Sequence, residues 1–232
     1  MDAKLEKGLT IYFIRHGETY FNLHQRTQGW VDPFLTPKGI EDMRQVGKRL
    51  SRVRFDAAIV SDLKRTTRTA EILLDESIYP RWMVPIRELA DFREISFGSF
   101  EGMTANETWE MLRQYLGFPS VEAMLNETTE AERLSALKPA DLHGEGEDYQ
   151  DYLAHLHVGA DKLLDELGDT DATLLFVGHS INIRHILQYL IPKEDHIPEL
   201  YDMYSMKNGG IITINNQSGK FKIHQYMDKF YE

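Results

Sequence analysis

The chain contains no cysteine among its 232 residues. Disulfide bonds, thiol nucleophiles and cysteine-based zinc or iron–sulfur sites are therefore excluded. It also has no apolar run close to the ~18 residues that a membrane-spanning helix needs. Residues 1–8 carry charges where a signal peptide would be apolar. From these absences we expect a cytoplasmic protein without a membrane partner.

Positive charge is also scarce. Lys and Arg number 26 against 37 Asp and Glu, which gives a net charge of -11. Because sequence-independent nucleic-acid binding needs a basic face, we expect no nucleic-acid partner. A few Arg residues in a cleft can still attract a compact anion. The composition, 42% hydrophobic and 27% charged, is typical of a folded domain, and the length suits one sizeable core.

Three short apolar runs predict strands that are buried on both faces: residues 10–14, 57–60 and 173–177. Helical patterns follow them, at 64–75 and from about 183 to Pro192. A further helix is predicted from Pro37, with Thr36 as its cap. Residues 211–214 and 221–223 flank a polar turn and predict a hairpin. This alternation predicts an α/β protein, a three-layer α/β/α sandwich with a mostly parallel central sheet.

The alternation is interrupted at about residues 103–147. Residues 105–116 and 121–137 have helical patterns, separated by Gly117-Phe118-Pro119. We interpret this segment as a helical cap inserted into a single domain that spans 1–232. The apolar cap residues fit packing against the domain better than a substrate lining: Trp109, Met111, Leu112 and Tyr115.

Polar residues follow three of the predicted strands: Arg15-His16, Ser61-Asp62 and Gly178-His179. In a parallel sheet the ligand crevice lies beyond the carboxyl ends of the strands, so these residues are expected to converge. Imidazole can attack phosphorus, and guanidinium matches the geometry of phosphate. Metal-binding spacings such as H-E-x-x-H are missing. The sequence therefore predicts phosphoryl transfer that needs no metal and no cofactor.

Four motifs follow one another in a recognisable order. The first is Arg15-His16-Gly17-Glu18-Thr19, with Asn22, Arg26 and Gln28-Gly29-Trp30 after it. The others are residues 61–71, which start Ser61-Asp62, residues 93–102, which start Arg93-Glu94, and Val177-Gly178-His179-Ser180. Together they resemble the histidine phosphatase superfamily, which includes cofactor-dependent phosphoglycerate mutases. The resemblance covers residues 11–190 and is weakest in the cap.

The resemblance implies a catalytic role for five residues. His16 would attack the phosphorus and carry the phosphoryl group. Arg15, Arg65 and His179 would hold its non-bridging oxygens. Glu94 would protonate the leaving oxygen and then deprotonate the attacking water. Glu88 and Asp91 compete for this last role, but the position of Glu94 four residues before Gly98 favours it.

Five further residues are candidates for substrate binding. The resemblance implies that Asn22 donates to the phosphate, that Gly17 permits close backbone approach, and that the backbone at Ser180 adds a donor. Ser180 stands where the family commonly has glycine, which makes that contact less secure. Arg26 and Gln28 could reach the substrate or lie on a solvated loop. Arg68 and Glu101 are expected to be structural.

The cap distinguishes the candidate activities. A mutase must hold a bisphosphate, which demands additional basic residues. Before Lys138 the cap offers only Arg113 and Arg133, beside an acidic stretch. We therefore expect hydrolysis of small phosphorylated metabolites, as in the broad-specificity bacterial phosphatases that this cap resembles. The alternatives are a phosphoglycerate mutase (an isomerase), a phosphatase of the α-ribazole phosphate type, and a noncatalytic phosphoanion-binding or interaction module.

The oligomeric state stays open at this point. Four residues near the end of the chain fit either a homodimer interface or ordinary packing: Tyr201, Met203, Tyr204 and Met206.

Overall fold

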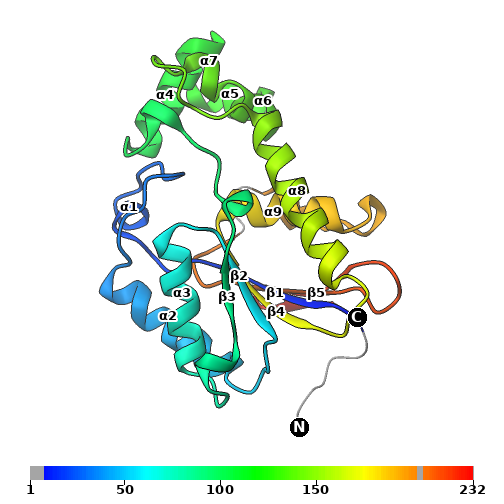
Figure 1. Ribbon diagram of the computed structural model, residues 1–232. Helices are drawn as coiled ribbons and strands as arrows, with labels where there is room; N and C mark the ends of the chain where they lie inside the picture. Colours follow the sequence, from blue (N-terminus) through cyan, green and yellow to red (C-terminus); the bar gives the residue numbers. More distant parts are fainter. Residues whose placement is uncertain (1–7, 203–205, 232) are drawn as a thin grey trace.

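A seven-stranded sheet lies at the centre of the computed structural model, which describes residues 8–202 and 206–231 (Figure 1). Across the sheet the strands run in the order β3-β2-β4-β1-β5-β6-β7. The four strands from β3 to β1 are parallel, and β5, β6 and β7 continue the sheet antiparallel. The strands are β1 (Thr10–Arg15), β2 (Ala57–Val60), β3 (Ile86–Glu88), β4 (Thr173–Gly178), β5 (Ile211–Asn215), β6 (Lys222–Tyr226) and β7 (Lys229–Phe230).

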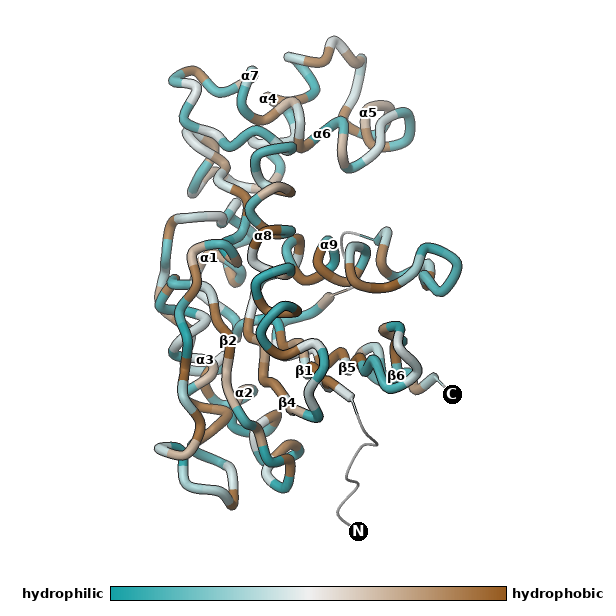
Figure 2. The backbone as a smooth tube through the Cα atoms, turned by 45° about the vertical axis from the view of Figure 1, so that its right-hand side comes forward, coloured by the Kyte–Doolittle hydropathy of each residue, from teal (hydrophilic) through white to brown (hydrophobic). Residues whose placement is uncertain are grey.

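Alternate side chains of the central strands enter two separate hydrophobic clusters. In β1, Ile11 and Phe13 join one cluster and Ile14 joins the other. In β4, Phe176 and Val177 are divided in the same way. Successive side chains of a strand point to opposite faces, so both faces of the sheet must be covered. Figure 2 shows the strands as largely hydrophobic segments in the interior.

Helices α2 (Pro37–Leu50) and α3 (Lys64–Asp75) cover one face, and α8 (Tyr149–Leu167) and α9 (Ser180–Leu190) cover the other (Figure 1). The predicted start of α2 is confirmed, because the Thr36 hydroxyl accepts the N–H of Gly39. The predicted hairpin is the β5–β6 pair. The α/β fold class and its layered arrangement are thus confirmed.

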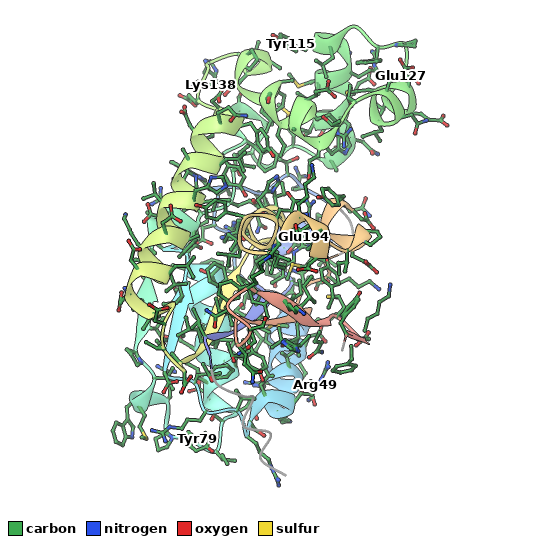
Figure 3. All side chains as sticks on the ribbon, turned by 90° about the vertical axis from the view of Figure 1, so that its right-hand side faces the viewer. Arg49, Tyr79, Tyr115, Glu127, Lys138 and Glu194 are labelled. Carbon is green, nitrogen blue, oxygen red and sulfur yellow. The ribbon has the colours of Figure 1, made fainter. Side chains whose placement is uncertain are left out.

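The cap consists of α4 (Ala105–Leu116), α5 (Val121–Glu127), α6 (Glu130–Ser135) and α7 (Leu137–Ala140). These helices lie beyond one end of the sheet, where Figure 3 labels Tyr115, Glu127 and Lys138. The prediction of one helix over 121–137 was wrong. Thr128 is extended, with φ -120° and ψ 148°, and Thr129 caps a new helix in a capping box with Glu132.

The apolar stripe of α4 lies mostly in the larger hydrophobic cluster, where the helix contacts α5 and α7 of the cap. Leu112 is buried, and Trp109 and Met111 pack against the larger hydrophobic cluster. Tyr115 is exposed instead. Packing is therefore the role of the first three side chains.

Short helices connect the larger elements: α1 (Tyr20–Leu23) and the 3-10 turns η1 (Arg81–Met83), η2 (Ala90–Phe92), η3 (Gly98–Phe100), η4 (Lys193–Asp195) and η5 (Pro198–Tyr201). Within the described ranges, no helix is both long enough and apolar enough to cross a membrane. Tyr201 is exposed and Met206 is buried, whereas Met203 and Tyr204 lie outside the described residues.

Candidate active site

The site begins where two neighbouring parallel strands end. Arg15 of β1 is paired in register with Gly178 of β4. The next residues are His16 and His179, and the N–H of His16 donates to the carbonyl of Gly178 at 3.0 Å. Their rings lie 5.3 Å apart, centroid to centroid, and both side chains are almost completely buried. The structure thus brings together the two imidazoles whose convergence the strand pattern predicts.

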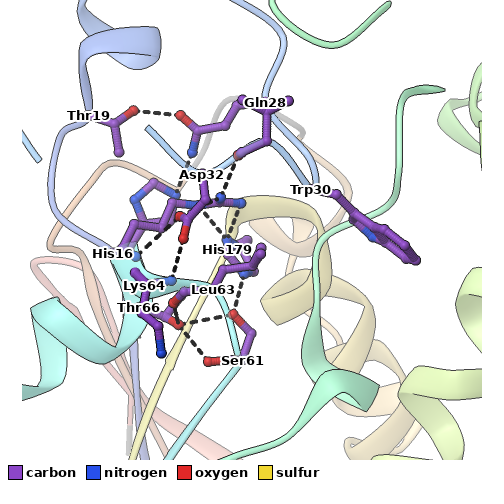
Figure 4. A network of polar contacts seen from close by, with 12 residues as sticks. His16, Thr19, Gln28, Trp30, Asp32, Ser61, Leu63, Lys64, Thr66 and His179 are labelled. Atoms are coloured by element: carbon purple, nitrogen blue, oxygen red, sulfur yellow. Dashed lines mark hydrogen bonds and ion pairs between the residues drawn. The ribbon is translucent and has the colours of Figure 1, made fainter. Parts of the chain in front are cut away.

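The environment of His16 leaves one ring nitrogen available as a nucleophile. Its Nδ1 lies 2.8 Å from the carbonyl oxygen of Gly17, which can only accept, so Nδ1 carries the proton. The Nε2 atom therefore carries no proton, and its lone pair accepts from the amide N–H of Gln28 at 3.4 Å. Thr19 orients that amide by donating to its oxygen (Figure 4). Burial, with Arg65 and Arg15 nearby, holds the pKa of His16 well below its usual value.

His179 has the opposite tautomer. Its Nδ1 lies 3.1 Å from Nη2 of Arg65, which can only donate, so Nδ1 accepts. Its Nε2 then donates to the hydroxyl of Ser61 at 2.9 Å, and Ser61 contacts Thr66 (Figure 4). Burial and the charge of Arg65 lower the pKa of His179, so the free protein holds this ring neutral.

Arg65 provides a buried positive charge beside both rings. It is the second residue of α3, and the carboxylate of Asp32 accepts from its backbone N–H and lies 3.3 Å from its Nη1. Besides Nδ1 of His179, its guanidinium also contacts the carbonyls of Gly29 and Val31. Asp32 takes the place of a capping side chain, since Leu63 gives α3 none. The guanidinium is thus fixed before any ligand arrives.

Arg15 is held less completely. Its Nη1 donates to the carbonyl of Met206, while its buried Nε has no hydrogen-bond partner. Burial lowers the pKa of Arg15 to about 10, so the group stays charged at neutral pH. A buried, unpaired N–H on a charged group is a donor that an anion can satisfy.

Glu94 lies in the loop after η2 and is 4% exposed. Its Oε1 accepts from the N–H of Ile95 and from the hydroxyl of Tyr152, and its Oε2 accepts from the N–H of Ile181 in the first turn of α9. Burial raises the pKa of Glu94 in spite of these donors and of Arg65. A carboxyl with a raised pKa can hold a proton and release it again.

The rival acids face elsewhere. Glu88 is exposed and pairs with Lys64, and Asp91 pairs with Lys162 on α8. Glu101 accepts backbone N–H groups of the loop at 29–31, as expected of a structural residue.

Only some of the predicted substrate-binding residues lie near the histidine pair. Gln28 touches His16, as described above. The oxygen of Asn22 accepts the N–H of Thr19 and an amide proton of Asn208, so only its NH₂ group remains as a donor. The hydroxyl of Ser180 is buried and has no partner. By contrast, Arg26 is exposed and donates to the carbonyl of Gly102 at the base of the cap. It is not brought to the histidine pair.

Gly17 is required for packing against α2. A Cβ there would lie 2.9 Å from Met43 and 3.1 Å from the carbonyl of Gly39. Its N–H donates to Thr69 at 3.0 Å. The backbone N–H of Gly17 is therefore already paired with a side chain of α3, and the expected close approach of a phosphate to Gly17 stays a prediction.

Two residues of this neighbourhood carried no signal in the sequence. Asn208 donates to the carbonyl of His16 at 2.8 Å from a loop 192 residues away. Tyr152 reaches Glu94 from α8. Neither lies in a motif, and only the strand order that brings the end of the chain beside β1 could have indicated Asn208.

A cavity of about 510 Å³ opens beside the loop that follows Glu94, and neither His16 nor His179 lines it. Its lining includes Trp30, Ser96, Glu145 and Glu147. The indole of Trp30 points away from the histidines in Figure 4, and its Nε1 donates to the carbonyl of Glu94. The cavity therefore borders the loop that carries Glu94.

Comparison with known proteins gives consistent matches. A family model for the histidine phosphatase superfamily (branch 1) matches residues 11–229. The chain is 35% identical over 114 residues to a protein of Bacillus subtilis (strain 168) named uncharacterized phosphatase PhoE. This aligned stretch covers 49% of this chain and 56% of that protein. It is 48% identical over 67 residues to a probable phosphoglycerate mutase, GpmB, of Erwinia tasmaniensis. This aligned stretch covers 29% of this chain and 31% of that protein.

These matches span from about a third to just over half the length of the two curated relatives. Among solved structures, the fold is similar to that of phosphoglycerate mutase from Bacillus anthracis str. Sterne. The TM-score is 0.83 at 25% identity, over 97% of this chain and 95% of that one.

Proposed function

The chain belongs to the histidine phosphatase superfamily, and on this premise we propose that it hydrolyses phosphomonoesters of small metabolites through a phosphohistidine at His16. One observation carries the proposal. The unprotonated Nε2 of a neutral His16 lies beside His179 and beside the buried guanidinium of Arg65. This arrangement offers a nucleophile together with positive charge for a tetrahedral anion.

In the first step Nε2 of His16 attacks phosphorus. The bond between phosphorus and the ester oxygen breaks, and Glu94 gives its proton to the leaving alcohol. Arg15 and Arg65 balance the charge on the three non-bridging oxygens. These groups replace a metal in the proposed mechanism.

His179 needs a proton on Nδ1 to donate to the same anion, because Nδ1 accepts from Arg65 in the free protein. The hydroxyl of Ser61 can either accept from Nε2 or donate to it. Ser61 therefore permits His179 to change its tautomer, or to become charged, when a phosphoryl group binds.

In the second step water attacks the phosphorus of phosphohistidine. Glu94, now ionised, takes a proton from the water, and the bond between phosphorus and Nε2 breaks. Phosphate leaves, and both His16 and Glu94 return to their starting protonation states.

A phosphoglycerate mutase is the second candidate, favoured by the similarity to the Bacillus anthracis structure. The cap residues support hydrolysis instead. The guanidinium of Arg113 pairs with Glu110 of the same helix, and Arg133 is buried against Thr128. Both guanidinium groups are thus already paired with groups inside the cap. A mutase would need such cations to bind a second phosphate.

Two assays on the purified protein test this proposal. We expect hydrolysis of p-nitrophenyl phosphate and of alkyl phosphates in the presence of a chelator. We expect no interconversion of 3- and 2-phosphoglycerate with added bisphosphoglycerate. Bisphosphoglycerate-dependent interconversion would establish the mutase, and vanadate binding without any turnover would establish a noncatalytic module.

A further inference from the structure

Glu94 has a third partner that the proposed mechanism does not use. Tyr152 lies in the second turn of α8 and is fully buried, and its hydroxyl is 3.2 Å from Oε1 of Glu94. The ring is fixed on its other sides by Tyr149, His155 and His185, whose rings lie 5.3 to 6.4 Å away. The hydroxyl is therefore delivered to the carboxyl by a rigid helix.

The hydrogen bonds divide the two carboxyl oxygens into unlike sites. Each oxygen has two lone pairs. Oε1 accepts the N–H of Ile95 at 3.2 Å as well as the Tyr152 hydroxyl, so both of its lone pairs are occupied. Among the described residues, Oε2 accepts one N–H, that of Ile181 at 3.0 Å, so one lone pair stays open.

We propose that Tyr152 is a positioning residue for the catalytic acid: its hydroxyl saturates Oε1 of Glu94, so that the proton exchanged with the substrate sits on Oε2. The inference rests on the proposed function for the acid role of Glu94, but the hydrogen bond itself can be tested without turnover. Removing the hydroxyl opens a second place for the proton, on the oxygen that faces α8.

Tyr152 also stabilises the ionised form of Glu94. A donor to a carboxylate favours its charged state, and here it acts against the burial that raises the pKa of Glu94. Burial keeps the pKa of Tyr152 well above its usual value, so the phenol remains a donor. The other charges that face this carboxyl are Arg65 from α3, Arg15 from β1 and Arg184 from α9. None of them is altered by a change at Tyr152.

The direct test is the titration of Glu94, followed by NMR of the ¹³C-labelled glutamate carboxyl and assigned with Glu94→Gln. In Tyr152→Phe we expect the pKa of Glu94 to rise by about one unit, because a donor to the charged form is lost. Replacing Tyr152 with 3-fluorotyrosine, whose hydroxyl is a stronger donor, should move that pKa the opposite way. An unchanged pKa in both proteins overturns the proposal.

The matched control is Tyr149→Phe. Tyr149 lies one turn earlier in α8, and its hydroxyl contacts Nε2 of His185 at 2.7 Å instead of Glu94. This variant removes a buried phenol from the same helix and should leave the titration of Glu94 unchanged. An equal shift in both variants would indicate loosening of α8, which contradicts a specific role for Tyr152.

Kinetics provide the second readout. The alkaline limb of kcat/KM for an alkyl phosphate should move to higher pH in Tyr152→Phe, whereas that for p-nitrophenyl phosphate should not, since its leaving group needs little protonation. In a Glu94→Gln background, Tyr152→Phe should cause no further loss. If the wild-type protein hydrolyses no phosphomonoester, the proposed function fails, and the NMR titration still decides the role of Tyr152.

Discussion

At the scale of single residues, burial has opposite effects on His16 and Glu94. Removal from water disfavours the charged form of each group, so the pKa of the imidazole falls and that of the carboxyl rises. A neutral imidazole is the nucleophilic form, and a protonated carboxyl is the acid form. The same buried surroundings thus prepare both groups for the first step of the proposed mechanism.

Glu94→Gln tests the acid role by leaving-group dependence. We expect a loss of about 100-fold or more in kcat/KM for alkyl phosphates and of about 10-fold or less for p-nitrophenyl phosphate, because only the poor leaving group needs protonation. Steady-state rates across a series of leaving groups measure this difference. Equal losses across the series would remove Glu94 from the acid role.

The sequence could identify residues of this site only where they lie close to a motif or a strand end. His16 and His179 each follow a buried strand, and Arg65 lies in a helix that begins just after β2. Tyr152 and Asn208 make comparably close contacts but lie in an ordinary helix pattern and in a loop. Their roles depend on how α8 and the chain end pack, which no local pattern encodes.

At the scale of elements, one buried ion pair connects the cap to the main layers. Arg184 of α9 contacts Glu130 of α6 through two hydrogen bonds, of 2.6 and 2.9 Å. The Arg184 side chain is 0% exposed and that of Glu130 is 17% exposed. Loss of one partner would leave a buried charge uncompensated.

We therefore predict that Glu130→Met lowers the free energy of unfolding by about 3 kcal/mol or more. The double variant with Arg184→Met should lose less than this single one. Urea denaturation of the singles and the double measures the cycle. The exposed Arg87–Glu166 pair is the control, and its disruption should cost less than about 1 kcal/mol. A double variant less stable than Glu130→Met would contradict the account.

Helix α8 also braces the loop of Glu94 through His155. Its Nδ1 donates to the carbonyl of Asp91, its Nε2 lies 3.1 Å from Glu147, and Glu147 accepts the N–H of Ser96. Burial alone would lower the pKa of His155, but the nearby carboxylate of Glu147 and the hydrogen bond to the carbonyl of Asp91 outweigh it and raise the pKa. These contacts hold the chain on both sides of Glu94.

Because the pKa of His155 is raised in the folded state, the stabilisation from its contacts with Glu147 and Asp91 depends on pH in a defined direction. Its contribution to stability is fully present below the unfolded pKa of about 6.5 and is lost as the pH rises through the folded value. His155→Gln should therefore cost more unfolding free energy at pH ~5.5 than at pH ~9, as measured by urea denaturation. The same cost at both pH values would show that the His155–Glu147 pair does not titrate as described.

Local sequence patterns predicted the boundaries of some helices correctly and those of others wrongly. Thr36-Pro37 marks the start of α2 because a cap and a pre-set φ act within one turn. The break at Thr128-Thr129 was missed, since an apolar period continues across it. A capping box of Thr129 with Glu132 was readable in principle, but the extended Thr128 also depends on how α6 packs.

At the scale of the whole molecule, the fold concentrates positive charge that the composition lacks. The net charge is -11, yet Arg15 and Arg65 flank the two imidazoles at the carboxyl ends of the parallel strands. Strand alternation was enough to predict that the residues at these strand ends converge. Two features could not be predicted, because both arise from packing between distant segments. They are the contact of the cap with α9 through Glu130 and Arg184, and the cavity beside Trp30.

The central claim is that separate strand ends assemble one phosphoryl-transfer site around His16. Rapid quenching during turnover of a ³²P-labelled phosphomonoester, followed by mapping of acid-labile label, tests it most directly. We predict label on His16 in the wild-type protein, and neither label nor turnover in a folded His16→Ala variant. Label on another residue, or hydrolysis by His16→Ala near the wild-type rate, would contradict the account.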